Sequence, residues 1–398
     1  MKKVIVILII CLVIVMGGYF LWSNPNIGED MGNKISTFFD NLIEGKYVAY
    51  TREFEINELK ISNSDYYFNK LTSDQQNMYT AVAIAAKNVE QVAKVKAYEN
   101  IIDDIIITDA STAMEAFFAD HPEVFYLKLE YEVYTIKSAF GKDVEIKLKY
   151  ITDDKTQIEE QIKTVKSKVD TILAEITATS QIDREIQIHD KLCSKIEYYK
   201  YDDINNIPVD KHTIYGALVK NSAVCDGMSK AMQILLDKVG IENILVTGKI
   251  DDLHAWNLVK IENQWYHLDI ISDKSIKDSN NLTVHSYFNV TTEDILKTHE
   301  INNLQNLPEA NQNKYNYYIY KDLYINSSDD FNTKLQNIIS KNESDKVLEF
   351  WVSKDISDVP DKIISSLQKN KNSSYLSENL SKVSYYSILN SYIIKKII

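Results

Sequence analysis

Apolar residues recur at helical spacing through the middle of the chain. The longest stripe steps by 4, 3, 4, 3 and 4 residues, through Ile158, Ile162, Val165, Val169, Ile172 and Ile176. This single apolar face predicts a long amphipathic helix. The run 79–92 predicts an earlier helix. A further helix is predicted directly after the long one by a second stripe, which consists of Ile182, Ile186, Cys193 and Ile196.

Two pairs of segments alternate between apolar and polar residues, as strands with one solvated face do. The first pair, 126–133 and 144–150, has Gly141 between its members and predicts an antiparallel hairpin. The second pair, 254–261 and 265–271, is joined by three polar residues and predicts another hairpin.

Length and composition are typical of a globular protein with two or three domains. The chain has 398 residues, of which 45% are hydrophobic and 25% charged. Near the C-terminus, 318–320 and 347–352 predict strands, and a short apolar stripe predicts a helix: Phe331, Leu335 and Ile338. We therefore expect a terminal segment (1–24), an N-terminal α+β domain (25–178), a central domain (179–300) and a C-terminal α+β accessory domain (301–398).

Charge and cysteine content exclude several classes of protein. The net charge of −13 gives no general attraction to nucleic acid, so we expect no nucleic-acid partner. Three cysteines, Cys11, Cys193 and Cys225, are too few for a disulfide scaffold or a multi-cysteine metal site.

The first residues predict the location of the protein. Val4–Trp22 is a run of uncharged residues behind Lys2 and Lys3, and as a helix it would be about 28 Å long, enough to span a bilayer. The positive-inside rule leaves the N-terminus in the cytoplasm and the remaining domains outside. Cleavage near Val15-Met16-Gly17 would make the protein secreted instead of anchored in the cell membrane.

Glycines gather around Cys225, which suggests close backbone packing there. Gly216, Gly227, Gly240 and Gly248 fall within 33 residues. The stripe that follows Cys225 predicts a helix ended by Gly240, so the cysteine lies in or just before its first turn. The positive end of the helix dipole favours the thiolate, which is the nucleophilic form of cysteine.

The second hairpin supplies two partners for this thiol. With a two-residue turn at Glu262-Asn263, Trp256 is opposite Asp269, and His254 and Asp269 are diagonal neighbours on one face. A three-residue loop without a bulge would place them on opposite faces. In the first register Asp269 orients the imidazole and the other ring nitrogen faces Cys225, as in Cys-His-Asp acyl transfer.

Three short boxes carry a resemblance to a known family. Cys225-Asp226-Gly227, His254-Ala255-Trp256-Asn257 and Trp265-Tyr266-His267-Leu268-Asp269 resemble the signature boxes of the transglutaminase-like superfamily, in its usual order. The resemblance covers roughly 182–290. Residues 121–127 are also similar to a stretch that precedes this domain in secreted members of the superfamily from clostridia, which are bacteria.

The resemblance implies a papain-like α+β core, in which a helix bearing cysteine packs on an antiparallel sheet bearing histidine and aspartate. It implies chemistry on carboxamide or peptide bonds without a redox cofactor. We expect no other cofactor and no metal. Cys225 would be the nucleophile, His254 the general base and acid, and Asp269 the orienting group. Many members have Thr-Trp-Asp-Asp just after this point, whereas residues 270–273 of this chain are Ile-Ile-Ser-Asp. The three triad residues are unaffected by this change, but the wall of the substrate cleft is expected to differ.

Other residues of this region have alternative roles. His267 could replace His254 as base, and Tyr215, Trp256 and His267 could line the substrate cleft or pack in the core. Cys193 is interpreted as a buried apolar residue, with a disulfide to Cys225 as the alternative. The remaining five histidines are assigned to packing or the surface: His121, His189, His212, His285 and His299.

Two classes of function follow. The first is an extracytoplasmic cysteine enzyme acting on protein or cell-wall peptide substrates, with water as acceptor for hydrolysis or a lysine amine for cross-linking. The second is a non-catalytic cell-surface module that retains the fold. The backbone N–H of Cys225 is the natural oxyanion donor in the first case.

Overall fold

The computed structural model describes residues 65–98, 102–138, 141–274, 283–302, 306–342, 347–369, 385–389 and 391–395. All of them belong to one compact unit, Ile56–Ile398, so the domain boundaries at 178 and 300 stay predictions. The segment expected to span the membrane lies outside the described residues. Among the helices of the described ranges, none is both long and apolar enough to cross a membrane.

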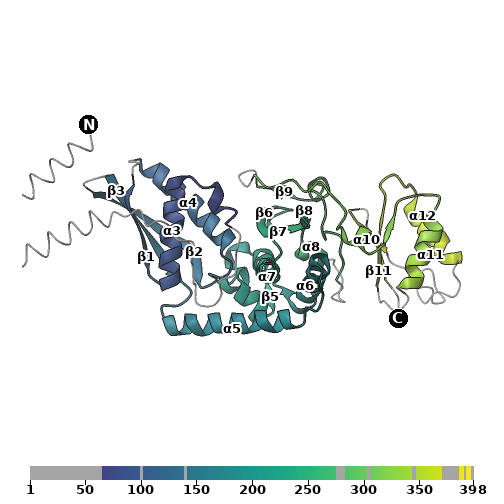
Figure 1. The fold of residues 1–398 in the computed structure, drawn as a ribbon, viewed down its shortest axis with the longest axis horizontal. Coiled ribbons are helices and arrows are strands. Elements are labelled where there is room, and N and C mark those ends of the chain that lie inside the picture. The colour runs from purple at the N-terminus through teal and green to yellow at the C-terminus, as the bar shows by residue number, and fades with distance from the viewer. Residues whose placement is uncertain are drawn as a thin grey trace, which may run out of the picture. The chain divides into compact units, whose positions relative to one another are not determined.

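The first described region is a three-stranded antiparallel sheet with two helices packed against it (Figure 1). The strand order is β1-β3-β2, and the predicted hairpin is confirmed as β2 and β3. The helix expected over 79–92 ends earlier, because Val89 adopts a left-handed φ of 55° and the chain then enters a strand. The elements are a 3-10 helix (Phe68–Lys70), α3 (Ser73–Asn88), β1 (Val92–Tyr98), α4 (Asp103–Asp120), β2 (Leu127–Ser138) and β3 (Gly141–Tyr150).

Two successive helices confirm the stripes of the central sequence. In α5 (Lys155–Ala174) the predicted apolar positions up to Ile172 are buried. In α6 (Gln181–Lys195) the buried face includes Cys193, which is 1% exposed. Both helices begin where a side chain satisfies free backbone N–H groups, Asp154 for α5 and Ser180 for α6.

The central region contains a four-stranded antiparallel sheet in the order β8-β7-β6-β9, and α7 packs on β6 and β7 (Figure 1). The predicted hairpin is confirmed: Ile261 pairs with Gln264 across a turn in which Glu262 and Asn263 have φ values of 46° and 66°. Its elements are α7 (Cys225–Lys238), β6 (Asn243–Lys249), β7 (Leu253–Ile261), β8 (Gln264–Leu268), α8 (Ile270–Lys274), α9 (Thr292–Ile295) and β9 (Glu300–Ile301).

Short elements lead into α7. A parallel pair of two-residue strands, β4 and β5, lies just before the helix, together with two 3-10 helices and one π-helical turn. These elements are β4 (Glu197–Tyr198), the 3-10 helices Ile204–Asn206 and Val209–His212, the π-helix Tyr215–Val219 and β5 (Ser222–Ala223).

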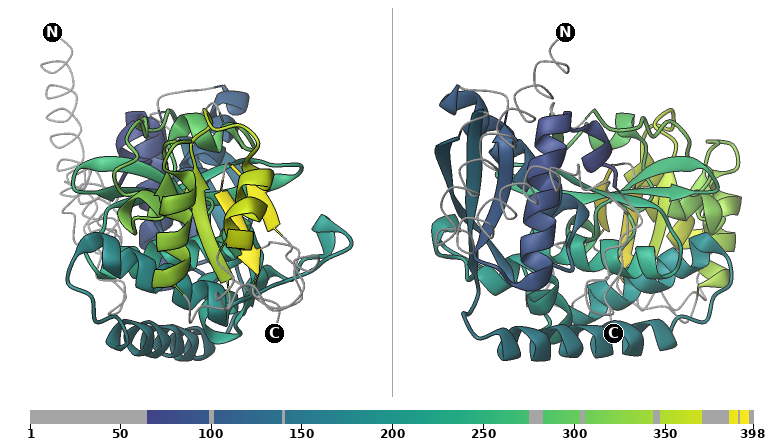
Figure 2. Two further views of the ribbon diagram at one scale, coloured as in Figure 1. Left: turned by 90° about the vertical axis from the view of Figure 1, so that its right-hand side faces the viewer. Right: turned by 60° about the vertical axis from the view of Figure 1, so that its left-hand side comes forward.

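The C-terminal region has its own mixed sheet, which Figure 2 shows from two further sides. It also has its own apolar core. The predicted strand over 347–352 and the predicted helix from Phe331 are confirmed. The strand predicted over 318–320 is wrong: the segment is helical, because the Asn316 side chain accepts the N–H of Tyr318 and caps a helical turn. The elements are α10 (Tyr317–Tyr320), β10 (Tyr324–Ile325), α11 (Phe331–Lys341), β11 (Val347–Val352), α12 (Val359–Lys369), β12 (Tyr385–Ile388) and β13 (Ser391–Lys395), with sheet order β10-β11-β13-β12.

Candidate active site

Cys225 is the first residue of α7 and is partly exposed. Its sulfur lies 4.0 Å from the carbonyl oxygen of Leu253, the first residue of β7. A Cβ at Gly227 would be 2.4 Å from the carbonyl oxygen of Lys211, so only glycine lets the preceding segment pack on this first turn. The helix start thus presents a reachable thiol beside the strand that carries His254.

Two hydrogen bonds fix α7 against β7. The Ser229 hydroxyl donates to the carbonyl oxygen of Ala255 (2.9 Å), and the Asn257 side chain donates to the carbonyl oxygen of Ser229 (3.1 Å). Both side chains are fully buried. The box around His254 therefore also sets the register between the helix that bears the cysteine and the strand that bears the histidine.

His254 and Asp269 meet as the two-residue turn predicts. His254 Nε2 lies 2.9 Å from Asp269 Oδ2, and the Asp269 side chain is fully buried. The other carboxylate oxygen accepts the backbone N–H groups of Ile271 (3.0 Å) and Ser272 (3.2 Å). The segment that departs from the family pattern after Asp269 therefore anchors this carboxylate.

Electrostatics favour a charged imidazole. Burial by itself lowers the pKa of His254, but the Asp269 carboxylate and hydrogen bonding to Cys225 outweigh it and raise that pKa to about 10. Burial by itself raises the pKa of Asp269, but the two imidazoles on it, His254 and His299, hold that pKa well below its usual range. Because Nε2 of His254 binds Asp269, Nδ1 is the nitrogen left to face the sulfur.

His299, assigned to packing from the sequence, is a second imidazole on the same carboxylate. Its Nε2 lies 3.0 Å from Asp269 Oδ2, and its Nδ1 lies 2.8 Å from the Thr298 hydroxyl. His299 comes directly before β9, which pairs with β6 at Gly248. A Cβ at Gly248 would be 1.9 Å from the carbonyl oxygen of Glu300, so this glycine admits the strand that delivers His299.

Trp256 and His267, which the sequence left as candidates for either the substrate cleft or the core, are core residues next to His254. Trp256 has no exposed surface, and its ring stacks on that of His254 with centroids 5.9 Å apart. Its indole N–H donates to His267 Nδ1 (3.0 Å). Burial lowers the pKa of His267 to about 3, which leaves it neutral and able to accept this bond. Neither residue lines an open cleft; both support His254 from the core.

Two tyrosines differ in their relation to the sulfur. Tyr215 is half-buried, and its ring stacks on Phe125 of the first region, with centroids 5.7 Å apart, and not on a triad residue. Tyr198 of β4 is half-buried near Cys225: burial and then the charge of Cys225 raise its pKa. Tyr198 is the better candidate for the cleft, and no sequence pattern pointed to it.

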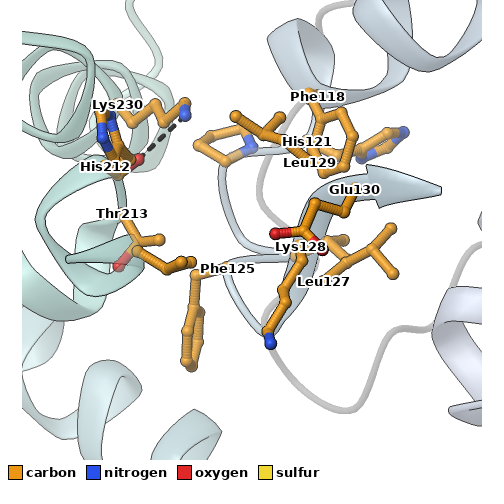
Figure 3. Close-up of a pocket in the computed structure, with 13 residues that line it drawn as sticks. Phe118, His121, Phe125, Leu127, Lys128, Leu129, Glu130, His212, Thr213 and Lys230 are labelled. Carbon is orange, nitrogen blue, oxygen red and sulfur yellow. Dashed lines mark hydrogen bonds between the residues drawn. The ribbon is translucent and has the colours of Figure 1, made fainter. Parts of the chain in front are cut away.

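The two cysteines described by the structure both carry free thiols, so the alternative disulfide between Cys193 and Cys225 is not formed. A cavity lies beside the site, shown in Figure 3, and none of the three triad residues lines it. His212 and Lys230 belong to its wall, and both side chains bind the carboxylate of Asp226. The cavity is thus joined to the nucleophile's helix through the residue that follows Cys225.

Within the described ranges, two groups of histidine and aspartate bring one ligand atom each to within 4.8 Å of one another. One is His254, Asp269 and His299, whose mutual hydrogen bonds orient the imidazole toward the sulfur. The other comprises His189, Asp190 and His285, which lie on α6 and in the segment before α9, apart from the triad residues.

A helix that starts with cysteine and packs on an antiparallel sheet bearing histidine and aspartate defines the transglutaminase-like, papain-like class of α+β domain. The comparison with family models agrees: residues 170–270 match the Transglutaminase-like superfamily. This part of the chain is a transglutaminase-like domain, and it contains Cys225, His254 and Asp269.

Among solved structures, one similar chain is described as a TGase, with 14% identity over 41% of this chain and a TM-score of 0.27. Another is from Cytophaga hutchinsonii, with a provisional assignment as a cysteine protease, 14% identity over 43% of this chain and a TM-score of 0.23. The matches span 48% and 65% of those chains. No curated protein matches.

Proposed function

We propose that the chain is a cysteine acyl-transfer enzyme that attacks carboxamide or peptide carbonyl groups through a thioester on Cys225. The observation that supports this most directly is the position of His254, whose Nε2 lies 2.9 Å from Asp269 Oδ2 and whose pKa is raised by that carboxylate and also by Cys225. This arrangement has the roles of nucleophile, proton carrier and orienting carboxylate.

In the first half-reaction the Cys225 thiolate attacks the carbonyl carbon and a tetrahedral oxyanion forms. The backbone N–H of Cys225 at the start of α7 is the proposed donor to that oxygen. The His254 imidazolium gives its Nδ1 proton to the leaving nitrogen as the C–N bond breaks, which releases an amine or ammonia. The products of this step are a thioester on Cys225 and a neutral imidazole.

In the second half-reaction a water molecule or an amine attacks the thioester. Neutral His254 takes the proton of the attacking group, and the sulfur leaves as the thiolate, which restores the starting pair. Water gives an amidase or peptidase, and a lysine amine gives an isopeptide cross-link. The predicted location outside the cytoplasm favours surface proteins or cell-wall peptides as substrates.

Alkylation of the full chain tests the nucleophile. Iodoacetamide near neutral pH should add stoichiometrically to Cys225, as measured by intact mass, and the rate should fall sharply in His254→Ala. Buried Cys193 is the internal control and should stay unmodified. A Cys225 that reacts no faster in wild type than in His254→Ala would favour the non-catalytic surface module instead.

A glutaminyl peptide supplies the functional readout. Incubation with this peptide should yield an intact-mass thioester adduct on Cys225. Ammonia release without a primary amine indicates hydrolysis, and incorporation of a labelled amine indicates transfer. The backbone N–H groups of Ile271 and Ser272, which hold the Asp269 carboxylate, support the catalytic proposal over the non-catalytic alternative.

A further inference from the structure

A second cluster of metal-ligand residue types lies away from Cys225. His189 and Asp190 come from α6, and His285 comes from the segment that leads to α9. One ligand atom from each lies within 4.8 Å of the other two. In the metal-free chain, Asp190 Oδ1 is 3.0 Å from His189 Nδ1 and 2.8 Å from His285 Nε2. The proposed triad makes no use of these three side chains.

The far nitrogen of each imidazole is bound to a further carboxylate. His189 Nε2 is 3.2 Å from Asp273 Oδ2, and His285 Nδ1 is 2.6 Å from Glu349 Oε1. A carboxylate only accepts, so each nitrogen beside one carries a proton, and this includes the near nitrogens beside Asp190. Metal binding would release the protons of the near nitrogens, Nδ1 of His189 and Nε2 of His285, which would then present lone pairs to a common point. This carboxylate–histidine pattern is the one that orients imidazoles toward metal ions.

The two outer carboxylates are themselves held in place. Asp273 is fully buried, and its Oδ1 accepts the backbone N–H of Tyr287 (2.8 Å). Glu349 on β11 accepts the Tyr318 hydroxyl (3.0 Å) and the backbone N–H of His285 (3.0 Å) on Oε2. The orientation of both imidazoles is therefore fixed from outside the cluster, without any contribution from Asp190.

Exposure leaves one side of the cluster open. The His189 side chain is fully buried and that of His285 is 6% exposed, whereas that of Asp190 is 47% exposed. An opening bordered by Asp190, His285 and Thr283 connects the cluster to solvent. Two lysines also border it, Lys191 and Lys195, and both pair with Glu175. An ion can thus enter at the carboxylate and keep a water molecule on its open side.

Geometry and charge suit a small dication. Ligand atoms at about 2.1 Å from a tetrahedral ion lie roughly 3.4 Å apart. The Asp190 oxygen lies 3.0 and 2.8 Å from the two near nitrogens, so it would move outward by a few tenths of an ångström, and the two nitrogens lie within 4.8 Å of each other. Once the two near protons are released, the carboxylates of Asp190, Asp273 and Glu349 leave a partly buried negative charge that a divalent cation compensates.

We propose that His189 Nδ1, Asp190 Oδ1 and His285 Nε2 form a site for a divalent transition-metal ion, with Zn²⁺ the best match. Two imidazoles and one carboxylate are a donor set that Zn²⁺ takes, with water in the fourth position. Because Glu349 belongs to the C-terminal sheet, the bound ion also links that region to α6 through His285. This site departs from the sequence expectation, which assigned no metal.

Metal titration of the chelator-treated full chain tests the site. Zn²⁺ and Co²⁺ should each bind stoichiometrically, and His285→Gln and Asp190→Asn should each lower the affinity at least about tenfold. Zn²⁺ should raise the melting temperature of wild type but not of His285→Gln. Circular dichroism of the metal-free variants checks that they fold, and His254→Gln is the matched control in the other cluster, with wild-type affinity expected.

The cobalt spectrum separates the two clusters. Ligation by nitrogen and oxygen alone should give visible d–d bands without a thiolate-to-cobalt charge-transfer band. A charge-transfer band that disappears in Cys225→Ala, or affinity lost in His254→Gln, would assign the ion to the triad and overturn the proposal. Absence of stoichiometric binding, or binding unchanged in both His285→Gln and Asp190→Asn, would show that the second cluster is a hydrogen-bonded network only.

Discussion

Each of the two histidine–aspartate clusters contains two imidazoles and one carboxylate, but they differ in which of these groups is buried and held in place. In the triad cluster the carboxylate of Asp269 is fully buried and anchored by two backbone N–H groups, and it joins two imidazoles through one oxygen. In the second cluster the carboxylate of Asp190 is half-exposed, and the two imidazoles are the buried, anchored members.

The position of the anchor determines what each cluster can do. An anchored carboxylate holds the imidazole of His254 by one nitrogen and leaves the other for the sulfur, which suits proton transfer. Anchored imidazoles aim two ring nitrogens at an exposed carboxylate, and after the loss of their protons these nitrogens suit metal ligation. Each cluster also has a cysteine, but Cys225 is partly exposed at a helix start and Cys193 is 1% exposed.

The largest expected effect is that of Cys225→Ala, compared with Cys193→Ala as its control. Cys225→Ala should abolish the thioester adduct and turnover of the glutaminyl peptide, because it removes the sulfur on which the proposed thioester forms. Cys193→Ala should keep both, since its thiol is buried within α6. Intact mass after incubation with the peptide measures the adduct, and an adduct that survives in Cys225→Ala would refute the assignment of the nucleophile.

Removing the charge of Asp269 should have the next largest effect. Asp269→Asn changes one atom, but it no longer holds His254 in the productive tautomer, so kcat for the glutaminyl peptide should fall roughly 10³–10⁴-fold. Asp251→Asn is the matched control in an exposed turn of the same region and should keep wild-type kcat. Comparable losses in both variants would show that general charge, and not orientation by Asp269, supports turnover.

Local patterns predicted the part of the site that lies on adjacent elements. The alternation over 254–261 and 265–271, with a two-residue turn, was enough to place His254 beside Asp269, because the side-chain period of a strand is two residues. The apolar stripe predicted that Cys225 lies in or just before the first turn of a helix, and α7 does start at Cys225. Gly240, whose φ is 77°, marked the end of that helix.

The remaining residues of both clusters depend on contacts distant along the chain. His299 reaches Asp269 because a two-residue strand pairs with β6, and so short a strand has no periodicity to detect. Glu349 reaches His285 from another sheet across 64 residues. Gly248 was a visible signal of close packing, but nothing local indicated that the approaching strand would deliver an imidazole.

His299 provides a finer test of the triad cluster. His299→Ala removes a hydrogen bond to the charged carboxylate, which corresponds to about 1.5–3 kcal/mol, so kcat should fall roughly 10–100-fold. KM should stay unchanged, because His299 is 3% exposed and touches Asp269, not the substrate. His299→Gln keeps an N–H donor and should recover most of the loss. Equal kcat in both variants would indicate a packing role only.

The smallest expected effect is on the free energy of unfolding. The difference in stability between wild type and His254→Gln should depend on pH. The pKa of His254 is raised from about 6.5 to about 10, so the folded state binds this proton more tightly than the unfolded state. Its contribution is therefore complete below about pH 6.5 and is lost as the pH rises through about 10. Denaturant unfolding should show His254→Gln to be less stable than wild type by about 1–3 kcal/mol at pH 6, with the gap closing toward pH 10. A gap that is constant across this range would mean that His254 is held in the folded protein as a neutral imidazole.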